Sequence, residues 1–228
     1  MFSSKSYTGF LFALVLTASM VLSGCGKSES GETEEAASFN IEKSSLPRVS
    51  PKENPEAIST LSDLNNDFAL KFYKRLSGMT GNIVFSPYSI SLAMAMAYAG
   101  ASGETEKQIS DVFNFPIPQD GLHPQFNALD LALASRGNGA KGQDGKDFRL
   151  NIANQIFIQD GFPVLEEYLD VLALYYGAGI GILDFENNPE ESAQIINRWI
   201  EEKTEGLIKD VINKESIKGD TRLALINF

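Results

Sequence analysis

One predicted helix is apolar on every side, and this feature limits what the chain can fold into. Ser86 and Pro87 are typical of a helix start, because serine caps the first turn and proline fits the first helical position. The residues that follow, through Ala99, are almost all Ile, Leu, Met, Ala and Tyr. A helix with so little polar surface is expected inside a larger folded body.

Further helices are predicted where apolar residues recur three and four positions apart and so share one stripe of a helix. Thr105 with Gln108 fits a capping box that opens one of these helices. A proline-containing loop is expected over residues 114–124, before the next helix. The predicted helices cover residues 55–77, 105–113, 126–133, 165–172 and 189–204.

Strands are predicted mainly in the second half of the chain. From residue 148 to 158 every second residue is Phe, Leu or Ile except Asn154, which indicates a long strand with one buried face. Short strands are expected at 82–85 and 180–185. This order of elements, with neither a regular βαβ alternation nor a repeat, predicts an α+β fold.

The final strand, residues 223–228, is apolar in the manner of a strand buried at the centre of a sheet. A buried strand needs a neighbour on each side, since an apolar edge leaves backbone groups unpaired. We therefore expect a sheet that is truncated within a central strand.

The first residues have the features of an export signal. Lys5 precedes an apolar run, residues 9–22, that is shorter than the roughly 20 residues a membrane-spanning helix requires. The run ends in Leu-Ser-Gly-Cys25, which resembles the lipobox of bacterial lipoproteins. Residues 1–24 are then a signal peptide, and Cys25 carries lipid at the mature N-terminus. The alternative is an ordinary secretory signal in which Cys25 has no role.

Residues 25–56 are predicted to be a disordered acidic tether behind this lipidated Cys25, because Ser, Glu and Pro dominate and large apolar residues are scattered. The folded body is then residues 57–228, which is long enough for one domain with a real core. The predicted location is the outer side of a bacterial cytoplasmic membrane, with attachment through lipid.

Composition excludes several classes of function. The net charge of −11, from 30 acidic and 19 basic residues, argues against binding to nucleic acid or to an anionic lipid surface. Cys25 is the only cysteine, so no disulfide forms within the chain, and His123 alone cannot supply a paired-histidine zinc site. His123 precedes a proline in a polar stretch and is expected to be a solvated loop residue. No cofactor is implied.

Catalysis is also unexpected. Ser86 does not lie in a Gly-x-Ser-x-Gly elbow, and no histidine is placed to activate it. The glycine-rich segment 136–146 has no strand before it and no Lys-Ser/Thr after it, so it lacks the context of a phosphate-binding loop and is expected to be a surface loop. The chain is predicted not to be an enzyme.

Four motifs, in order along the body, resemble those of the serpin family. Asn-Ile-Val-Phe-Ser-Pro-Tyr-Ser-Ile-Ser from Asn82, followed by Gly-Ala-Ser-Gly-Glu-Thr from Gly100, is similar to the strand and helix start of that family. Leu-Asn-Ile-Ala-Asn-Gln-Ile-Phe from Leu150 is similar to a long strand of its large sheet. Ile-Asn-Arg-Trp-Ile-Glu-Glu-Lys-Thr-Glu-Gly from Ile196 and Thr-Arg-Leu-Ala-Leu-Ile-Asn from Thr221 resemble the helix in front of that sheet and the strand that enters its centre.

The resemblance implies the N-terminal half of a serpin domain, with helices packed on a large mixed β-sheet, and suicide inhibition of proteases. In that mechanism a bait loop is attacked as a substrate and then inserts as a strand into the sheet. The partners implied are extracellular serine proteases, with cysteine proteases as a second class. The bait loop of the family lies near its C-terminal end, so this reactive loop is expected to be absent from the 228 residues, which by themselves would not inhibit.

The resemblance also implies a buried hydrogen-bond network that controls opening of the sheet, at the positions of Ser86, Ser89 and Asn227. The simpler alternatives are a helix cap for Ser86 and a locally satisfied strand residue for Asn227. Trp199, Met94 and Met96 have helical spacing with other apolar residues and are expected in the core.

A second functional hypothesis is a non-inhibitory binding or structural lipoprotein that reuses this half of the fold. It requires residues 57–228 to fold cooperatively on their own.

Overall fold

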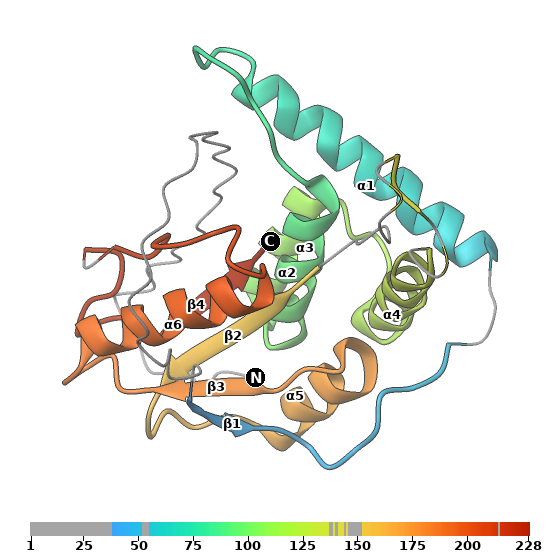
Figure 1. The fold of residues 1–228 in the computed structure, drawn as a ribbon. Coiled ribbons are helices and arrows are strands. Elements are labelled where there is room, and N and C mark those ends of the chain that lie inside the picture. The colour runs from blue at the N-terminus through green and yellow to red at the C-terminus, as the bar shows by residue number, and fades with distance from the viewer. Residues whose placement is uncertain are drawn as a thin grey trace.

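The computed structural model describes residues 38–51, 55–136, 139, 141–143, 145, 152–213 and 215–228. A mixed four-stranded sheet lies at its centre, with helices on both faces (Figure 1). The predicted signal peptide and Cys25 fall outside the described residues, as do residues 148–151 of the predicted long strand. Within the described part of the chain, no helix is both long enough and apolar enough to span a bilayer.

The sheet has the strand order β1-β3-β2-β4. Strand β2 runs parallel to β3 and antiparallel to β4, and β1 runs antiparallel to β3. The strands are β1 (Asn40–Glu42), β2 (Asn154–Gln159), β3 (Ile180–Leu183) and β4 (Leu223–Asn227). The α+β fold expected from the sequence is therefore confirmed.

Register explains why both faces of the sheet are buried. Ile156 lies opposite Ile180 on one side and Leu225 on the other, and these three side chains belong to one core cluster. Phe157 and Ala224 point to the opposite face and belong to another cluster. Because side chains alternate along a strand, every position of β2 and β4 between their ends has an apolar layer against it.

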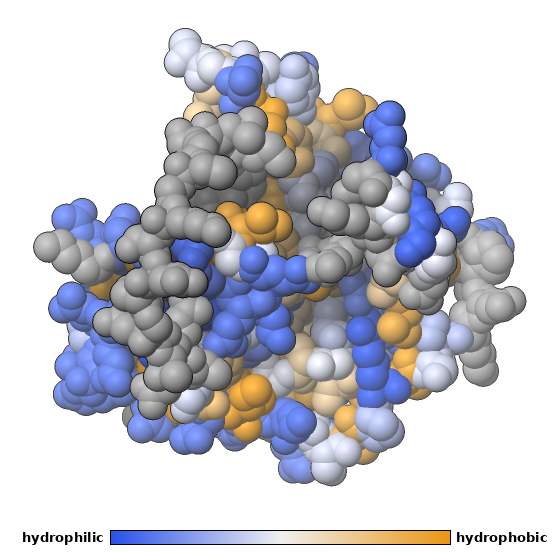
Figure 2. Space-filling view, in the orientation of Figure 1, coloured by the Kyte–Doolittle hydropathy of each residue, from blue (hydrophilic) through white to orange (hydrophobic). Residues whose placement is uncertain are grey.

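Six helices and a π-helical turn, η1, surround the sheet in the described residues. They are α1 (Pro55–Leu76), α2 (Pro87–Ala99), α3 (Gly103–Phe113), α4 (Gln119–Ser135), α5 (Glu166–Val171), η1 (Leu172–Tyr176) and α6 (Pro189–Lys203). Helix α6 crosses one face of the sheet, and its outer surface is mostly hydrophilic (Figures 1 and 2). Helix α2 packs on the other face, where it contacts β4.

Helix α2 has apolar contacts on opposite sides, as its sequence predicted. Ala93 and Met96 pack with the strands, whereas Leu92 and Ala95 pack with α1 and α4. The side chain of Ser86 caps its first turn by accepting a hydrogen bond from the backbone N–H of Ser89 at 3.2 Å. The expectation of a buried helix is thus confirmed.

Two predicted helix starts and one predicted strand differ from the structure. Helix α3 begins at Gly103, so Thr105 lies inside it, and the side chain of Gln108 bonds to Glu104 instead of forming a capping box. Helix α4 begins at Gln119, within the predicted loop. Residues 82–85, which were predicted to be a strand, pair with no described strand, and Val84 is 71% exposed.

Part of the predicted tether is folded onto the body. Residues 40–42 form β1 and pair with β3, and the ring of Phe39 packs edge-on against Phe157 at 5.0 Å. The boundary expected at residue 57 therefore differs from the structure for residues 38–51. The reason is that a few well-placed residues, Phe39 and Ile41 among them, make contacts that the average composition of the segment does not reveal.

Candidate functional site at the β4 edge

Strand β4 combines buried side chains with a backbone edge that no described strand covers. Ala224, Leu225 and Ile226 are 1%, 3% and 5% exposed. Strand β2 pairs with one side of β4, and no described strand pairs with the other. In an antiparallel pair, the N–H and C=O groups of alternate residues point away from the partner. Among the described residues, strand β4 therefore has the packing of a central strand and the unpaired backbone of an edge, as its sequence predicted for a truncated sheet.

Helix α6 holds this strand from one face. The ring of Trp199 meets Phe157 edge-on at 5.9 Å and lies 5.6 Å from the ring of Phe228. Trp199 is 7% exposed, and its predicted core position is confirmed. Met96 is likewise buried, and Met94 packs against the cluster on the opposite face. The aromatic contacts join α6, β2 and the end of β4 into one layer.

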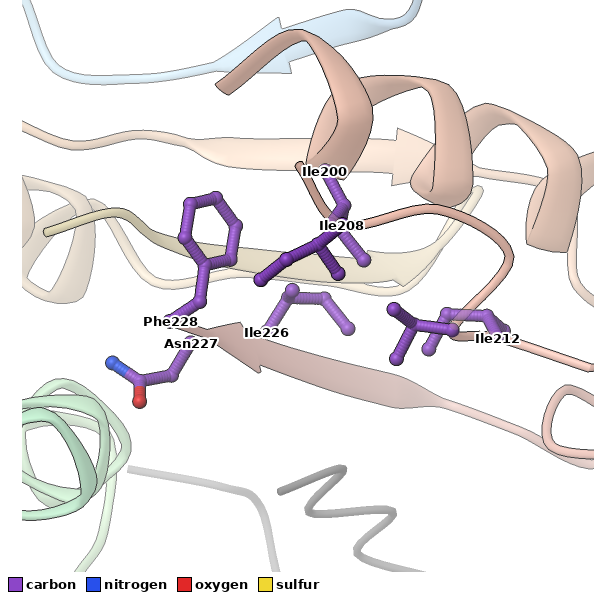
Figure 3. Close-up of a pocket in the computed structure, with 7 residues that line it drawn as sticks. Ile200, Ile208, Ile212, Ile226, Asn227 and Phe228 are labelled. Carbon is purple, nitrogen blue, oxygen red and sulfur yellow. The ribbon is translucent and has the colours of Figure 1, made fainter. Parts of the chain in front are cut away.

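A shallow hollow lies between the last turn of α6, the segment after it and the end of β4 (Figure 3). Figure 3 shows its apolar side chains converging between helix and strand, with the amide of Asn227 turned away from α6. The lining residues are Ile200, Ile208, Val211, Ile212, Ile226, Asn227 and Phe228. Such a surface favours packing against apolar groups and offers almost no polar chemistry.

The segment that lines the hollow is fixed to α6 by side-chain amide and hydroxyl groups. Asn197 accepts a hydrogen bond from the backbone N–H of Ile212 and donates one to its carbonyl, both at 2.8 Å. The hydroxyl of Thr204 accepts from the N–H of Ile208 at 3.1 Å. These bonds satisfy backbone groups that no strand ladder serves, so the hollow keeps a defined shape.

The residues predicted to control the sheet form two separate pairs. The hydroxyl of Ser86 donates to that of Ser89 at 3.0 Å, and Ser89 is 6% exposed. The side-chain amide of Asn227 donates to the Oδ1 atom of Asn154, directly across from it on β2. The sequence did not assign a role to Asn154, although this residue is the one that interrupts the apolar alternation of its strand. Control of sheet opening by Ser86, Ser89 and Asn227 stays a prediction.

His123 is buried, which corrects its assignment as a solvated loop residue. It lies in α4 with 2% of its surface exposed, and its Nδ1 atom is 2.7 Å from the hydroxyl of Tyr176. Burial lowers the pKa of His123 to about 4. The assignment failed because Pro124 suggested a loop, whereas α4 continues through this proline at the cost of one backbone hydrogen bond.

The chemistry of the described residues points to binding by backbone and apolar surface. No group of three or more His, Cys, Asp or Glu side chains that could hold a metal ion occurs among them. Ser86 serves as a helix cap with Ser89 as its partner. What the site offers is a strand edge flanked on one face by α6 and on the other by α2, which suits addition of another strand.

Comparison with known proteins identifies the family of the chain. The family model of the serpins (serine protease inhibitors) matches residues 63–228. An uncharacterized serpin-like protein from Methanosarcina mazei is 40% identical over 171 residues, which are 73% of this chain and 38% of that protein. Mouse antithrombin-III is 38% identical over 184 residues, covering 78% of this chain and 38% of the relative.

Solved structures agree. The cleaved Serpin 42Da aligns with a TM-score of 0.62 and 30% identity, over 75% of this chain and 43% of its own. A serpin from Arabidopsis in its native stressed conformation aligns with a TM-score of 0.62 and 25% identity, over 77% of this chain and 44% of its own. The chain spans about two fifths of the length of the curated relatives it matches. This chain belongs to the serpin family.

Proposed function

We propose that this chain forms the part of a protease inhibitor's β-sheet beside which the bait loop inserts as a new strand. The observation that carries the proposal is the state of β4, whose side chains are packed on both faces while its outer backbone edge has no described partner. A strand that pairs there gains main-chain hydrogen bonds without first having to build an apolar layer. Helices α6 and α2 already supply those layers.

The reaction follows from what such an edge can do to an acyl-enzyme. The hydroxyl of a protease serine attacks a carbonyl of the bait loop, the peptide bond breaks, the new amine leaves and an ester remains. The segment of the loop that bears the ester then pairs with β4 before water can attack the ester. Insertion moves the attached protease across the sheet and distorts its active site, so the ester persists. Residues of this chain take part as the receiving edge and make no covalent bond.

The proposed partners are serine proteases outside the cell, with cysteine proteases as the second class, since a thioester forms in the same way. Two relatives support inhibition as the activity, because they are named antithrombin-III and leukocyte elastase inhibitor A. The bond that is cut lies in the bait loop, so the target is chosen by residues other than those of the β4 edge.

The test of inhibition uses the complete reading frame that contains this sequence, and the 228-residue chain serves as its control. We expect the product of the complete frame to form a complex with a trypsin-like or elastase-like protease that survives boiling in detergent. We expect the 228-residue chain to form none. Complete digestion of the longer product with no such complex would refute the proposal and favour the non-inhibitory binding protein.

We also propose that the body is held at the outer face of a bacterial membrane through lipid on Cys25. Support comes from the Leu-Ser-Gly-Cys25 sequence after a short apolar run. Cells that express the chain and receive radiolabelled palmitate should label it, and Cys25→Ser should abolish the label. Equal labelling of the variant, or none in either chain, would contradict lipidation and leave the ordinary secretory signal.

A further inference from the structure

Residues 38–51 run from the outer edge of β3 to α4 and η1. We call these residues the strap. They precede the region matched by the serpin family model, which begins at residue 63. Strand β1 within the strap pairs with β3 over three positions, from Asn40 opposite Ile182 to Glu42 opposite Ile180. A three-residue pairing is too short to hold a peptide on its own, so other contacts must fix it.

Three glycines at alternate positions form a track under the strap. A Cβ atom on Gly179 would lie 2.7 Å from the side chain of Ile41 and 2.8 Å from the carbonyl oxygen of Glu42. One on Gly181 would lie 2.5 Å from the ring of Phe157 and 3.0 Å from that of Phe39, and one on Gly177 would lie 3.0 Å from Arg48. Real Cβ atoms essentially never come within 3.0 Å of another atom, so at Gly179 the strap fits only because a side chain is absent. At Gly177 and Gly181 the strap atoms lie at 3.0 Å, which is a tight approach, and the closest neighbour of Gly181 is Phe157 of β2.

A polar socket on α4 and η1 holds the other end of the strap. The guanidinium of Arg48 donates to Oδ1 of Asn127 and to the carboxylate of Asp130, each at 2.8 Å, and to the carbonyl of Tyr175 at 3.3 Å. Asn127, which is 1% exposed, donates from its amide to the carbonyl of Val49 at 2.8 Å.

The backbone completes the socket, since the N–H of Val49 donates to the carbonyl of Leu174 at 2.9 Å. At this end of the strap, both the guanidinium of Arg48 and the backbone of Val49 are therefore held by hydrogen bonds. Charge-assisted bonds of this kind are stronger than neutral ones, and the planar guanidinium makes them directional.

We propose that the glycine track and the Arg48 socket are a dedicated docking site for the strap, which fastens the N-terminal segment to the outer edge of the sheet and ties that edge to α4. The occupant is residues 38–51 in cis. The site recognises an extended segment with an aromatic residue at the position of Phe39 and an arginine at that of Arg48. Release of the strap uncovers the β3 edge and the Phe157 ring, while the β2–β4 pairing is left in place.

The test is hydrogen exchange of the full 228-residue chain, followed by mass spectrometry of peptides from the strap, from β3 and from α6. The main variant is Gly179→Ala, because the atoms that its Cβ would meet first all belong to the strap. Its matched control is Gly78→Ala, where a Cβ would meet nothing within 4 Å. We expect Gly179→Ala to speed exchange in the strap and in β3 by roughly tenfold or more, which corresponds to about 1.4 kcal/mol, with α6 unchanged.

A second set of variants tests the socket and leaves the three glycines unchanged. Arg48→Ala and Asp130→Ala should each speed exchange in the strap, and the double variant should be no faster than Arg48→Ala alone, since Arg48→Ala already removes the bond to Asp130 together with those to Asn127 and Tyr175. Lys107→Ala, which breaks the exposed ion pair between Lys107 and Asp111 on α3, serves as the control.

Strap amides that exchange in the unaltered chain as fast as in an unstructured peptide would overturn the proposal. So would a Gly179→Ala chain that is indistinguishable from Gly78→Ala, or effects of Arg48→Ala and Asp130→Ala that add.

Discussion

The single histidine provides a sensitive test of how α4 and η1 pack. His123 is buried against Tyr98, Tyr175 and Tyr176, and its Nδ1 atom has the hydroxyl of Tyr176 as partner. Its Nε2 atom is buried with no hydrogen-bond partner among the described residues. Protonation would therefore place a charge and an unpaired donor in the core, which is the reason that the pKa is lowered to about 4.

This shift fixes both the sign and the size of a pH effect. The unfolded chain binds a proton at His123 with a pKa near 6.5, whereas the folded chain does so near 4. Between these values the unfolded state binds more protons, so the free energy of unfolding falls as the pH is lowered. The contribution is complete above pH 6.5 and is lost as the pH falls toward 4. From pH 7 to pH 4.5 the loss is about 2 to 3 kcal/mol at about 1.4 kcal/mol per pKa unit.

The assay is urea unfolding at the two pH values, followed by the fluorescence of Trp199, for the parent chain and for His123→Asn. Asparagine keeps a polar group near the hydroxyl of Tyr176 but does not titrate. Carboxylates contribute equally to both chains, so the difference between the two pH-dependent losses isolates His123. We expect the parent to lose about 2 to 3 kcal/mol more than the variant. Equal losses, or a His123 pKa near 6.5 by NMR, would refute the buried, neutral histidine.

Three further substitutions test the packing around β4 and the cap of α2 by the same urea assay. Trp199→Ala should cost about 3 to 5 kcal/mol because it removes the ring that joins Phe157 to Phe228, so here unfolding is followed by circular dichroism, and a loss below about 1 kcal/mol would contradict this packing. Ser86→Ala should lower the free energy of unfolding by about 1 kcal/mol through loss of the α2 cap, whereas Ser86→Asp should retain most of that stability. Equal losses in the two variants would exclude capping. Asn227→Ala should cost about 1 to 3 kcal/mol by leaving Asn154 unpaired, and the double variant Asn154→Ala/Asn227→Ala should cost less than the sum of the two single ones; simple addition would mean that the pair is not coupled.

Elements were predictable from the sequence where one periodicity ran uninterrupted. Helix α1 was expected over residues 55–77 and spans Pro55–Leu76, because its apolar stripe is regular and glycines follow it. The apolar surround of α2 gave an equally clear signal, since burial on all sides leaves a direct pattern in residue type. The alternation over residues 148–158 predicted a strand with one buried face, whereas β2 spans Asn154–Gln159 and is buried on both faces. The core position of Trp199 followed from the same reasoning.

Three of the misses share one physical cause, which is that a contact far along the chain overrode a local signal. Pro124 indicated a loop, yet the burial of His123 and Phe126 against other elements keeps α4 helical through it. Asn154 was noted only as a break in a pattern, because its partner Asn227 is 73 residues away. Phe39 stood among Ser and Glu residues, and the aromatic ring that it meets, Phe157, comes from β2.

The two edges of the sheet differ in whether another segment covers them, and this difference bears on how the proposed inhibitor would work. At one edge β3 is covered by the strap, and at the other β4 keeps a free backbone side among the described residues. Docking of the strap leaves about 14 residues between Cys25 and Phe39, a reach of at most about 48 Å, instead of about 105 Å if the chain were free as far as Glu56.

A lipid on Cys25 would thus hold the body by its β3 side, because the segment that links Cys25 to the body ends at the strap. The β4 edge is three strand positions away, or about 14 Å across the sheet, on the side opposite the attachment. A strand and the protease bound to it could then reach β4 from the side that the linking segment does not occupy. Undocking of the strap by Gly179→Ala would remove this bias in orientation without altering β4, so the two edges can be tested separately.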